Sequence, residues 1–155
     1  MNLSEHLTLA EVTRSESAKR KGIDNTPSAD IIGNLKKLAE NVFEPIRNNF
    51  RVPIIISSGY RCVKLNKSIG GASSSQHCKG EAIDIDMDLT STGVTNAMIF
   101  DYVKDKLDFD QLIWEFGTDE NPDWVHVSYN SNGNQRKEIL KATRVNNKPH
   151  YAPYK

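Results

Sequence analysis

The sequence contains few of the features that mark secreted scaffolds, membrane proteins or nucleic-acid-binding proteins. Its two cysteines, Cys62 and Cys78, are too few for a disulfide framework. No apolar run approaches the ~20 residues that cross a bilayer, so we expect no membrane span. Twenty basic and 20 acidic residues leave zero net charge, which gives no general attraction to nucleic acid or to an anionic membrane. These absences predict a globular chain and say nothing about its chemistry.

The length of 155 residues fits one domain. We expect this domain to cover residues 1–145 and to be followed by an irregular tail, 146–155, because proline and asparagine in this tail resist helix and strand. We expect a monomer.

The first third of the chain predicts helices. Thr8 and Glu11 form a capping box at the start of a short helix, and Gly22 is the stop signal at its end. Ser28 caps a longer helix, in which an apolar stripe recurs at three- and four-residue steps. Pro45 lies within that pattern, so we expect a kink or a restart there. The stripe consists of Ile31, Leu35, Leu38, Val42 and Ile46.

The rest of the chain predicts mainly strands. We expect strands at 52–57, 82–87, 111–116 and 124–129, and an edge strand at 136–143. One helix is expected at 92–107, with Met98 and Tyr102 on its buried side and Ile99 and Val103 as further candidates for that side. Residues 70–75 predict a polar loop. Helices first and hairpin-linked strands later indicate an α+β fold in which N-terminal helices pack on a mainly antiparallel sheet.

Three polar residues lie where they can converge on one ion. His77 precedes the turn at Gly80, Asp84 faces away from the core side of strand 82–87, and His126 faces away from Val125 and Val127. Two imidazoles and one carboxylate form a common catalytic zinc set with a fourth position open for water. The alternative is that the histidines are structural and no metal binds.

Two carboxylates and one arginine are candidates for the reaction itself. Asp123 lies three residues before His126, at the end of a turn where an irregular backbone could swing its carboxylate toward the ligands; alternatively it makes only an Asx turn. Glu115 is the rival base, or a partner that orients a ligand histidine. Arg61 offers donors suited to a developing oxyanion.

Several motifs together resemble one family. They are Ser57-Ser58-Gly59-Tyr60-Arg61, Leu65-Asn66, Gly70-Gly71, the run from Ser75 to Ile85, and the run from Asp123 to Tyr129. Over about residues 7–130 the chain resembles the zinc D-alanyl-D-alanine carboxypeptidases and L-alanyl-D-glutamate endolysins, which share a fold with the Hedgehog signalling domain. Its N-terminal part resembles the compact phage and prophage branch.

The resemblance implies a role for each matching residue. It makes His77, Asp84 and His126 the ligands of Zn²⁺, Asp123 the general base, and Arg61 the group that stabilises the substrate carbonyl. Ser75 and Gln76 match the segment that leads into the first ligand and are expected at the substrate. Tyr60, with Trp114 and Trp124, either forms part of the cleft wall at the substrate or lies in the core. The implied activity is hydrolysis of a peptidoglycan stem-peptide bond next to a D-amino acid.

The same resemblance leaves alternatives open. The chain could be a non-catalytic, zinc-stabilised binding module, with Cys78 as a fourth ligand. Cys62 and Cys78 follow site residues directly, so they are expected close together, as free thiols by preference, or as a disulfide or metal contact. Since no secretory signal is recognisable at Met1, we expect a cytoplasmic protein released by lysis or carried on a virion.

Overall fold

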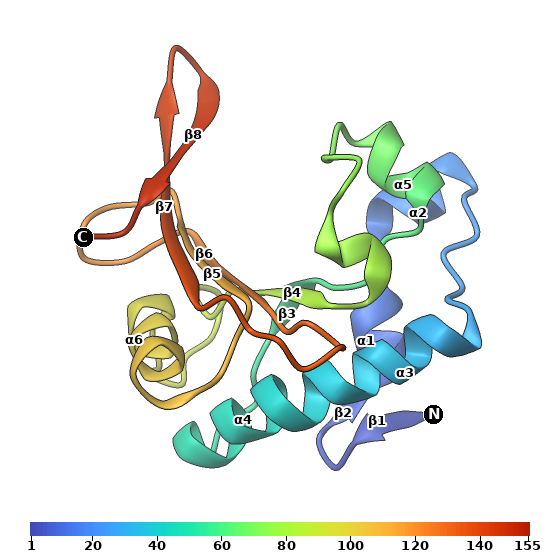
Figure 1. Cartoon of the computed structure of the whole chain (residues 1–155), viewed down its shortest axis with the longest axis horizontal. Coiled ribbons are helices and arrows are strands. Elements are labelled where there is room, and N and C mark those ends of the chain that lie inside the picture. The colour runs from blue at the N-terminus through green and yellow to red at the C-terminus, as the bar shows by residue number, and fades with distance from the viewer.

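The computed structural model describes all 155 residues, Met1–Lys155 (Figure 1). The strands are β1 (Asn2–Ser4), β2 (Leu7–Thr8), β3 (Ile56–Ser58), β4 (Ala82–Ile85), β5 (Gln111–Glu115), β6 (Trp124–Ser128), β7 (Glu138–Val145) and β8 (Lys148–Pro153). The helices are α1 (Leu9–Thr13), α2 (Glu16–Lys21), α3 (Ala29–Leu38), the π-helix η1 (Ala39–Phe43), α4 (Glu44–Phe50), α5 (Val63–Ser68), the 3-10 helix η2 (Gln76–Lys79) and α6 (Asn96–Lys106). None of these helices is both long and apolar enough to span a membrane.

A six-stranded sheet organises the molecule. Its order is β3-β4-β6-β5-β7-β8, and all neighbours are antiparallel except the parallel pair β5–β7. A separate two-stranded sheet pairs β1 with β2. The predicted α+β class and the mainly antiparallel sheet are therefore confirmed.

The first predicted helix is two helices. Thr8 and Glu11 form the expected capping box on α1. The backbone then becomes extended at Arg14, and the Ser15 side chain caps α2, which ends at Gly22 in the left-handed region. Ser15 competes for the backbone amides of the following turn, and this local capping interrupts what the sequence predicts as one helix.

The long second helix contains the expected irregularity. Ser28 caps α3, and a π-helical turn, η1, joins it to α4 just before Pro45. Since proline has no amide hydrogen, a locally widened turn lets the chain pass it without breaking the helix. The stripe from Leu35 to Ile46 is buried as predicted.

Two other elements differ from expectation in length. The strand predicted at 52–57 is shorter and later, β3 at Ile56–Ser58, because Pro53 has no amide to pair. The helix predicted at 92–107 begins only at Asn96, where the Thr95 side chain caps it. Met98 is 43% exposed rather than buried, and the buried face is formed by Ile99, Phe100 and Val103.

The C-terminal segment is the largest correction. Residues 146–155, predicted as an irregular tail, contain β8, which pairs along its whole length with β7. Asn146 and Asn147 both have positive φ, and this conformation makes a two-residue hairpin turn rather than a disordered break. Beyond the hairpin, Tyr154 packs on Phe100 and Trp114, with ring centroids 4.8 and 5.9 Å apart.

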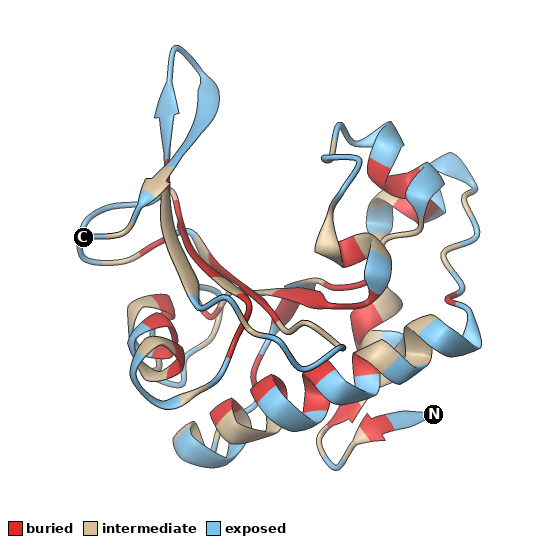
Figure 2. Ribbon diagram, in the orientation of Figure 1, coloured by how far each residue is buried: buried red, intermediate tan, exposed pale blue.

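The sheet has one core face and one polar face. Alternate residues of β4, β5 and β6 join a buried cluster with the helices; they include Ile83, Ile85, Leu112, Trp114, Val125 and Val127. In Figure 2 the buried positions concentrate where α3, α4 and α6 lie against the sheet. The intervening residues of the same strands face the opposite side, and there the sheet forms the floor of a cleft.

Candidate active site

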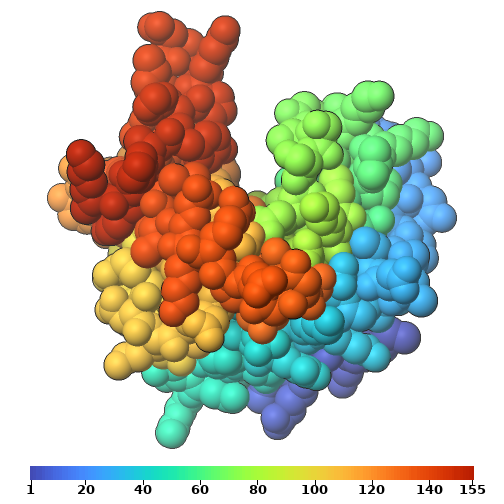
Figure 3. Space-filling model, viewed as in Figure 1, coloured from blue at the N-terminus to red at the C-terminus, as the bar shows by residue number.

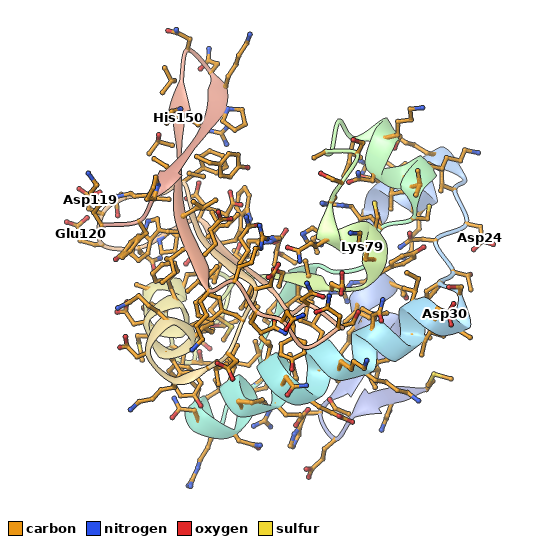
Figure 4. The ribbon with its side chains drawn as sticks, in the orientation of Figure 1. Asp24, Asp30, Lys79, Asp119, Glu120 and His150 are labelled. Carbon is orange, nitrogen blue, oxygen red and sulfur yellow. The ribbon has the colours of Figure 1, made fainter.

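The cleft lies between two raised walls. The β7–β8 hairpin rises on one side of the sheet, and α5 with the loop that leads to η2 rises on the other (Figure 3). Its volume is about 1140 Å³. Lys79 on η2 and His150 on β8 belong to these opposite walls (Figure 4). A cleft with this shape can receive an extended peptide.

His77, Asp84 and His126 meet on the cleft floor. Asp84 on β4 and His126 on β6 are directly paired across the antiparallel ladder. Oδ1 of Asp84 lies 3.1 Å from Nδ1 of His126 and 3.4 Å from Nε2 of His77. One ligand atom from each residue lies within 4.8 Å of the other two. The structure thus brings together the three predicted metal ligands.

Local structure fixes the orientation of His77. The Ser75 side chain accepts a hydrogen bond from the His77 amide and so caps η2. Nδ1 of His77 lies 2.7 Å from the carbonyl oxygen of Gly59. That bond leaves Nε2 for the cleft, as in metal-ligating histidines whose second nitrogen is held by a carbonyl.

The turn after η2 requires glycine. Gly80 has φ +70°, and a β-carbon there would lie 2.9 Å from the Ile31 side chain of α3. This close approach lets the chain leave η2 and enter β4 at once. His77 and Asp84 therefore reach the same point from two adjacent elements.

The charge of the three-residue group favours a cation. Burial alone would raise the pKa of the Asp84 carboxyl, but the nearby His77 and the hydrogen bond from His126 hold it well below its usual range. Both imidazoles are nearly buried, at 3% and 8% exposure. Two imidazole nitrogens directed at one ionised carboxylate oxygen fit a zinc ion with three protein ligands and an open face.

Glu115 lies on the same cleft floor. It is 5% exposed on β5, and its Oε2 is buried without a hydrogen-bond partner. Burial raises the pKa of this carboxyl to about 7, His126 opposes the shift, and Asp84 adds to it. A carboxyl that exchanges its proton near neutrality is suited to general acid–base work.

Asp123 does not reach the cleft. Its backbone amide donates to the carbonyl of Glu115, but Asp123 lies at a bend just before β6, outside the regular β5–β6 ladder. Trp124 and His126 of β6 line the cleft, whereas Asp123 is not among the residues that line it. Its side chain is exposed, and its carbonyl accepts a bond from Asn96 on α6. The backbone of this connection is irregular, as expected, with positive φ at Phe116 and Gly117, but it does not bring the Asp123 carboxylate into the cleft lining.

The remaining predicted residues divide between cleft and core. Arg61, Ser75 and Gln76 line the cleft. Nη1 of Arg61 bonds to Ser58, while its Nε is buried without a partner. Tyr60 is instead 8% exposed within the core cluster, so the structure does not support a substrate contact for it. It faces the core because its amide bonds to the Val12 carbonyl of α1.

Neither cysteine belongs to the ligand group. Cys62 and Cys78 are free thiols, and Sγ of Cys62 caps α5 by accepting from the Leu65 amide. Burial raises the pKa of the Cys78 thiol, Arg61 lowers it, and Cys62 adds to the rise. The two cysteines are therefore neighbours, as expected, and the ligand group that converges contains no fourth protein ligand from Cys78.

A second histidine cluster is structural. Glu5, His6 and Glu44 lie close enough to share an ion. Glu44 is already engaged, since its oxygens accept bonds from Ser4 and from the His6 amide and contact Nδ1 of His6. This cluster ties the β1–β2 turn to α4.

The sequence analysis missed the far wall of the cleft. Leu140, Arg144, Pro149 and Tyr151 of the β7–β8 hairpin all line it. The signal that could have revealed this wall is the Asn146-Asn147 pair, read as a hairpin turn between two segments of strand length.

The comparison with known families agrees with this site. The sequence profile of the Peptidase M15 family matches residues 5–128. This match covers most of the chain, which therefore belongs to peptidase family M15, a family of metallopeptidases that typically use zinc. No match was found among curated proteins. The β7–β8 hairpin lies outside the matched residues.

Proposed function

We propose that this chain is a zinc peptidase that hydrolyses a bond next to a D-amino acid in peptidoglycan stem peptides. The observation that carries the proposal is the convergence of His77, Asp84 and His126 beside Glu115 on the floor of an open cleft. Membership of the M15 family supports a peptidase. The bond is of the D-Ala-D-Ala or the L-Ala-D-Glu type, and the motifs shared with endolysins support a place in the compact phage branch.

The three ligands define where zinc would be held. Nε2 of His77, Oδ1 of Asp84 and Nδ1 of His126 would be its donors, and the side toward the cleft would stay open. When bound, zinc polarises a peptide carbonyl and lowers the pKa of a coordinated water.

Glu115 moves the proton in this mechanism. Its unpartnered Oε2 is available to take a proton from the attacking water. The same oxygen then delivers that proton to the leaving amine nitrogen, which completes the cleavage. We assign the general base to Glu115 rather than to Asp123, because only Glu115 lies in the cleft.

Arg61 orients the substrate. It lines the cleft near His77, and its backbone amide donates a hydrogen bond to the His77 carbonyl oxygen. Its guanidinium would donate to the carbonyl oxygen as negative charge develops there.

The proposal is tested by mass spectrometry of purified muropeptides digested with and without a chelator. We expect new fragments that disappear with the chelator and return with zinc. Loss of one terminal D-alanine would identify a carboxypeptidase, and cleavage between L-Ala and D-Glu an endopeptidase. One bound zinc per chain with no new fragment would refute a peptidase of this kind and favour a zinc-stabilised binding module.

A further inference from the structure

Arg144 occupies a defined place on the cleft wall. It lies on β7, where Leu140, Ala142 and Arg144 share one face by strand alternation. Ala142 pairs with Glu115 of β5 on one side and with Tyr151 of β8 on the other. Arg144 is therefore two residues further along the strand that adjoins the candidate general base.

The guanidinium of Arg144 lies over the ring of Phe116. Its central carbon lies 4.1 Å from the centroid of the Phe116 ring. The Phe116 ring in turn meets Trp124 edge-on, with centroids 5.4 Å apart. A guanidinium that lies over the face of a ring can still donate hydrogen bonds, because its N–H groups point outward in its own plane.

The backbone is strained at the point that places this ring. Phe116 has φ +57°, which is costly for a residue with a side chain. At Gly117, a β-carbon would lie 2.3 Å from the Asn121 carbonyl oxygen, so the connection from β5 to β6 is tight. Such strain persists only where surrounding structure imposes it, and here it sets Phe116 beneath Arg144.

Arg144 has no anionic partner within the protein. It forms no salt bridge and donates no side-chain hydrogen bond, in contrast to Arg136, whose guanidinium binds Asp110. Apart from Glu115, the acidic groups of the cleft are engaged: Asp110 with Arg136 and Gln76, Glu81 with the Ser131 amide, and Asp84 with the imidazoles. A planar, pre-oriented and unpaired guanidinium is a binding group for a carboxylate.

The spacing indicates how far from the cleaved bond such a carboxylate would lie. Two residues along a strand cover about 7 Å, and adjacent strands lie about 5 Å apart. The Cα atom of Arg144 thus lies roughly 8 Å from that of Glu115, a span that an extended peptide covers in about two residues at ~3.5 Å each. We propose that Arg144 binds a free carboxylate of the substrate about two residues from the cleaved bond, and so selects stem peptides that carry this group. This inference rests on the proposed function.

The test measures binding rather than turnover. Zinc-loaded protein with Glu115→Gln is titrated calorimetrically with three synthetic stem peptides: one with all carboxylates free, one amidated at the C-terminus, and one amidated at the D-glutamyl carboxylate. The amide that weakens binding identifies the carboxylate that Arg144 engages. Arg144→Gln is then added to the same background, with Arg144→Lys as the conservative variant and Lys148→Gln as the control. Lys148 carries the same charge on the same hairpin and does not line the cleft.

We expect Arg144→Gln to raise the Kd of the free peptide by about 10- to 100-fold, the range of a hydrogen bond to a charged group. It should leave the Kd of the sensitive amidated peptide unchanged, because that peptide has already lost the interaction. Arg144→Lys should restore part of the affinity, and Lys148→Gln should change it little. Equal effects on free and amidated peptides, or no effect on either, would overturn the proposal. If the parent protein binds none of the peptides, the proposed function fails, and the assignment of Arg144 fails with it.

Discussion

Asp84 and His126 face each other across the β4–β6 ladder, with Oδ1 of the first 3.1 Å from Nδ1 of the second. Both are on central strands of the sheet, and the ladder itself therefore fixes their separation. His77 reaches the same oxygen from η2, 3.4 Å away. Ligands on regular elements keep their geometry better than ligands on loops, so most of this site is formed before any ion binds.

Replacing Asp84 should abolish tight zinc binding. Asp84→Asn removes the only carboxylate of the ligand group, and we expect the zinc content after dialysis to fall from about one per chain to a small fraction, since even lesser changes around such sites cost ~10- to 100-fold in affinity. Elemental analysis measures the content. Zinc should raise the melting temperature of the wild type but not of the variant. Asp108→Asn, at an exposed ion pair with Lys137, is the control. A variant that retains stoichiometric zinc would remove Asp84 from the site.

The two candidate bases can be separated by matched substitutions. We expect Glu115→Gln to lower kcat by about 10²- to 10⁴-fold, the usual effect of losing general acid–base catalysis, while zinc content stays near that of the wild type. Asp123→Asn should change kcat only a few-fold, because Asp123 is exposed outside the cleft. Steady-state kinetics on the muropeptide identified above gives both values. The reverse pattern would return the role of base to Asp123.

Asp110 should contribute stability that depends on pH. Burial raises the pKa of its carboxyl, but the hydrogen bonds from Arg136 and Gln76 bring it below the ordinary value of 3.8. The unfolded state therefore binds more protons between the two pKa values. The stabilisation is fully present above the unfolded pKa and is lost as pH falls through the folded one.

We accordingly expect Asp110→Asn to lower the free energy of unfolding by about 2 kcal/mol at pH 7. The difference from wild type should shrink at pH 3. Urea titrations at both pH values measure it. Asp119→Asn, at an exposed pair with Lys141, should leave the free energy of unfolding nearly unchanged. A pH-independent difference for the Asp110 variant would mean that its effect is not electrostatic.

The C-terminal residues should matter for folding. Tyr154→Ala removes the ring that packs on Phe100 and Trp114, and we expect a loss of about 2 kcal/mol because each aromatic contact adds ~0.5–1.5 kcal/mol beyond its buried area. His150→Ala, on the exposed part of β8, should have little effect. Chemical denaturation compares the two. Equal stability of both variants would show that the residues after β8 are a dispensable tail.

The convergence of Asp84 and His126 could be predicted from the sequence because alternation decides which way a strand residue points. Ile83 and Ile85 are buried, which directs Asp84 to the other face, and Val125 and Val127 do the same for His126. The choice between Asp123 and Glu115 could not be made in this way. It depends on where the β5–β6 ladder begins, and the bond between the Asp123 amide and the Glu115 carbonyl is not visible in the sequence.

The cleft wall was missed for a similar reason. Asn146 and Asn147 are compatible with a disordered segment and with a tight turn, and pairing of β8 with β7 decides between them. The burial of Tyr60 could not be predicted from its neighbours either, because it depends on a contact with α1, which is distant in the sequence. Local sequence patterns predicted most of the helices and strands, whereas contacts between distant segments determine which residues line the cleft.

The composition of β8, a strand at one edge of the six-stranded sheet, opposes pairing with a further strand. β8 carries Pro149 and Pro153, which have no amide hydrogen, and begins with Lys148. Another strand that approached this rim would find missing donors and a positive charge, two devices that block edge-to-edge association. The β7–β8 hairpin, which projects into solvent, therefore has an edge that is poorly suited to pairing with a second molecule. This wall of the cleft thus stays accessible to incoming peptides at high protein concentration.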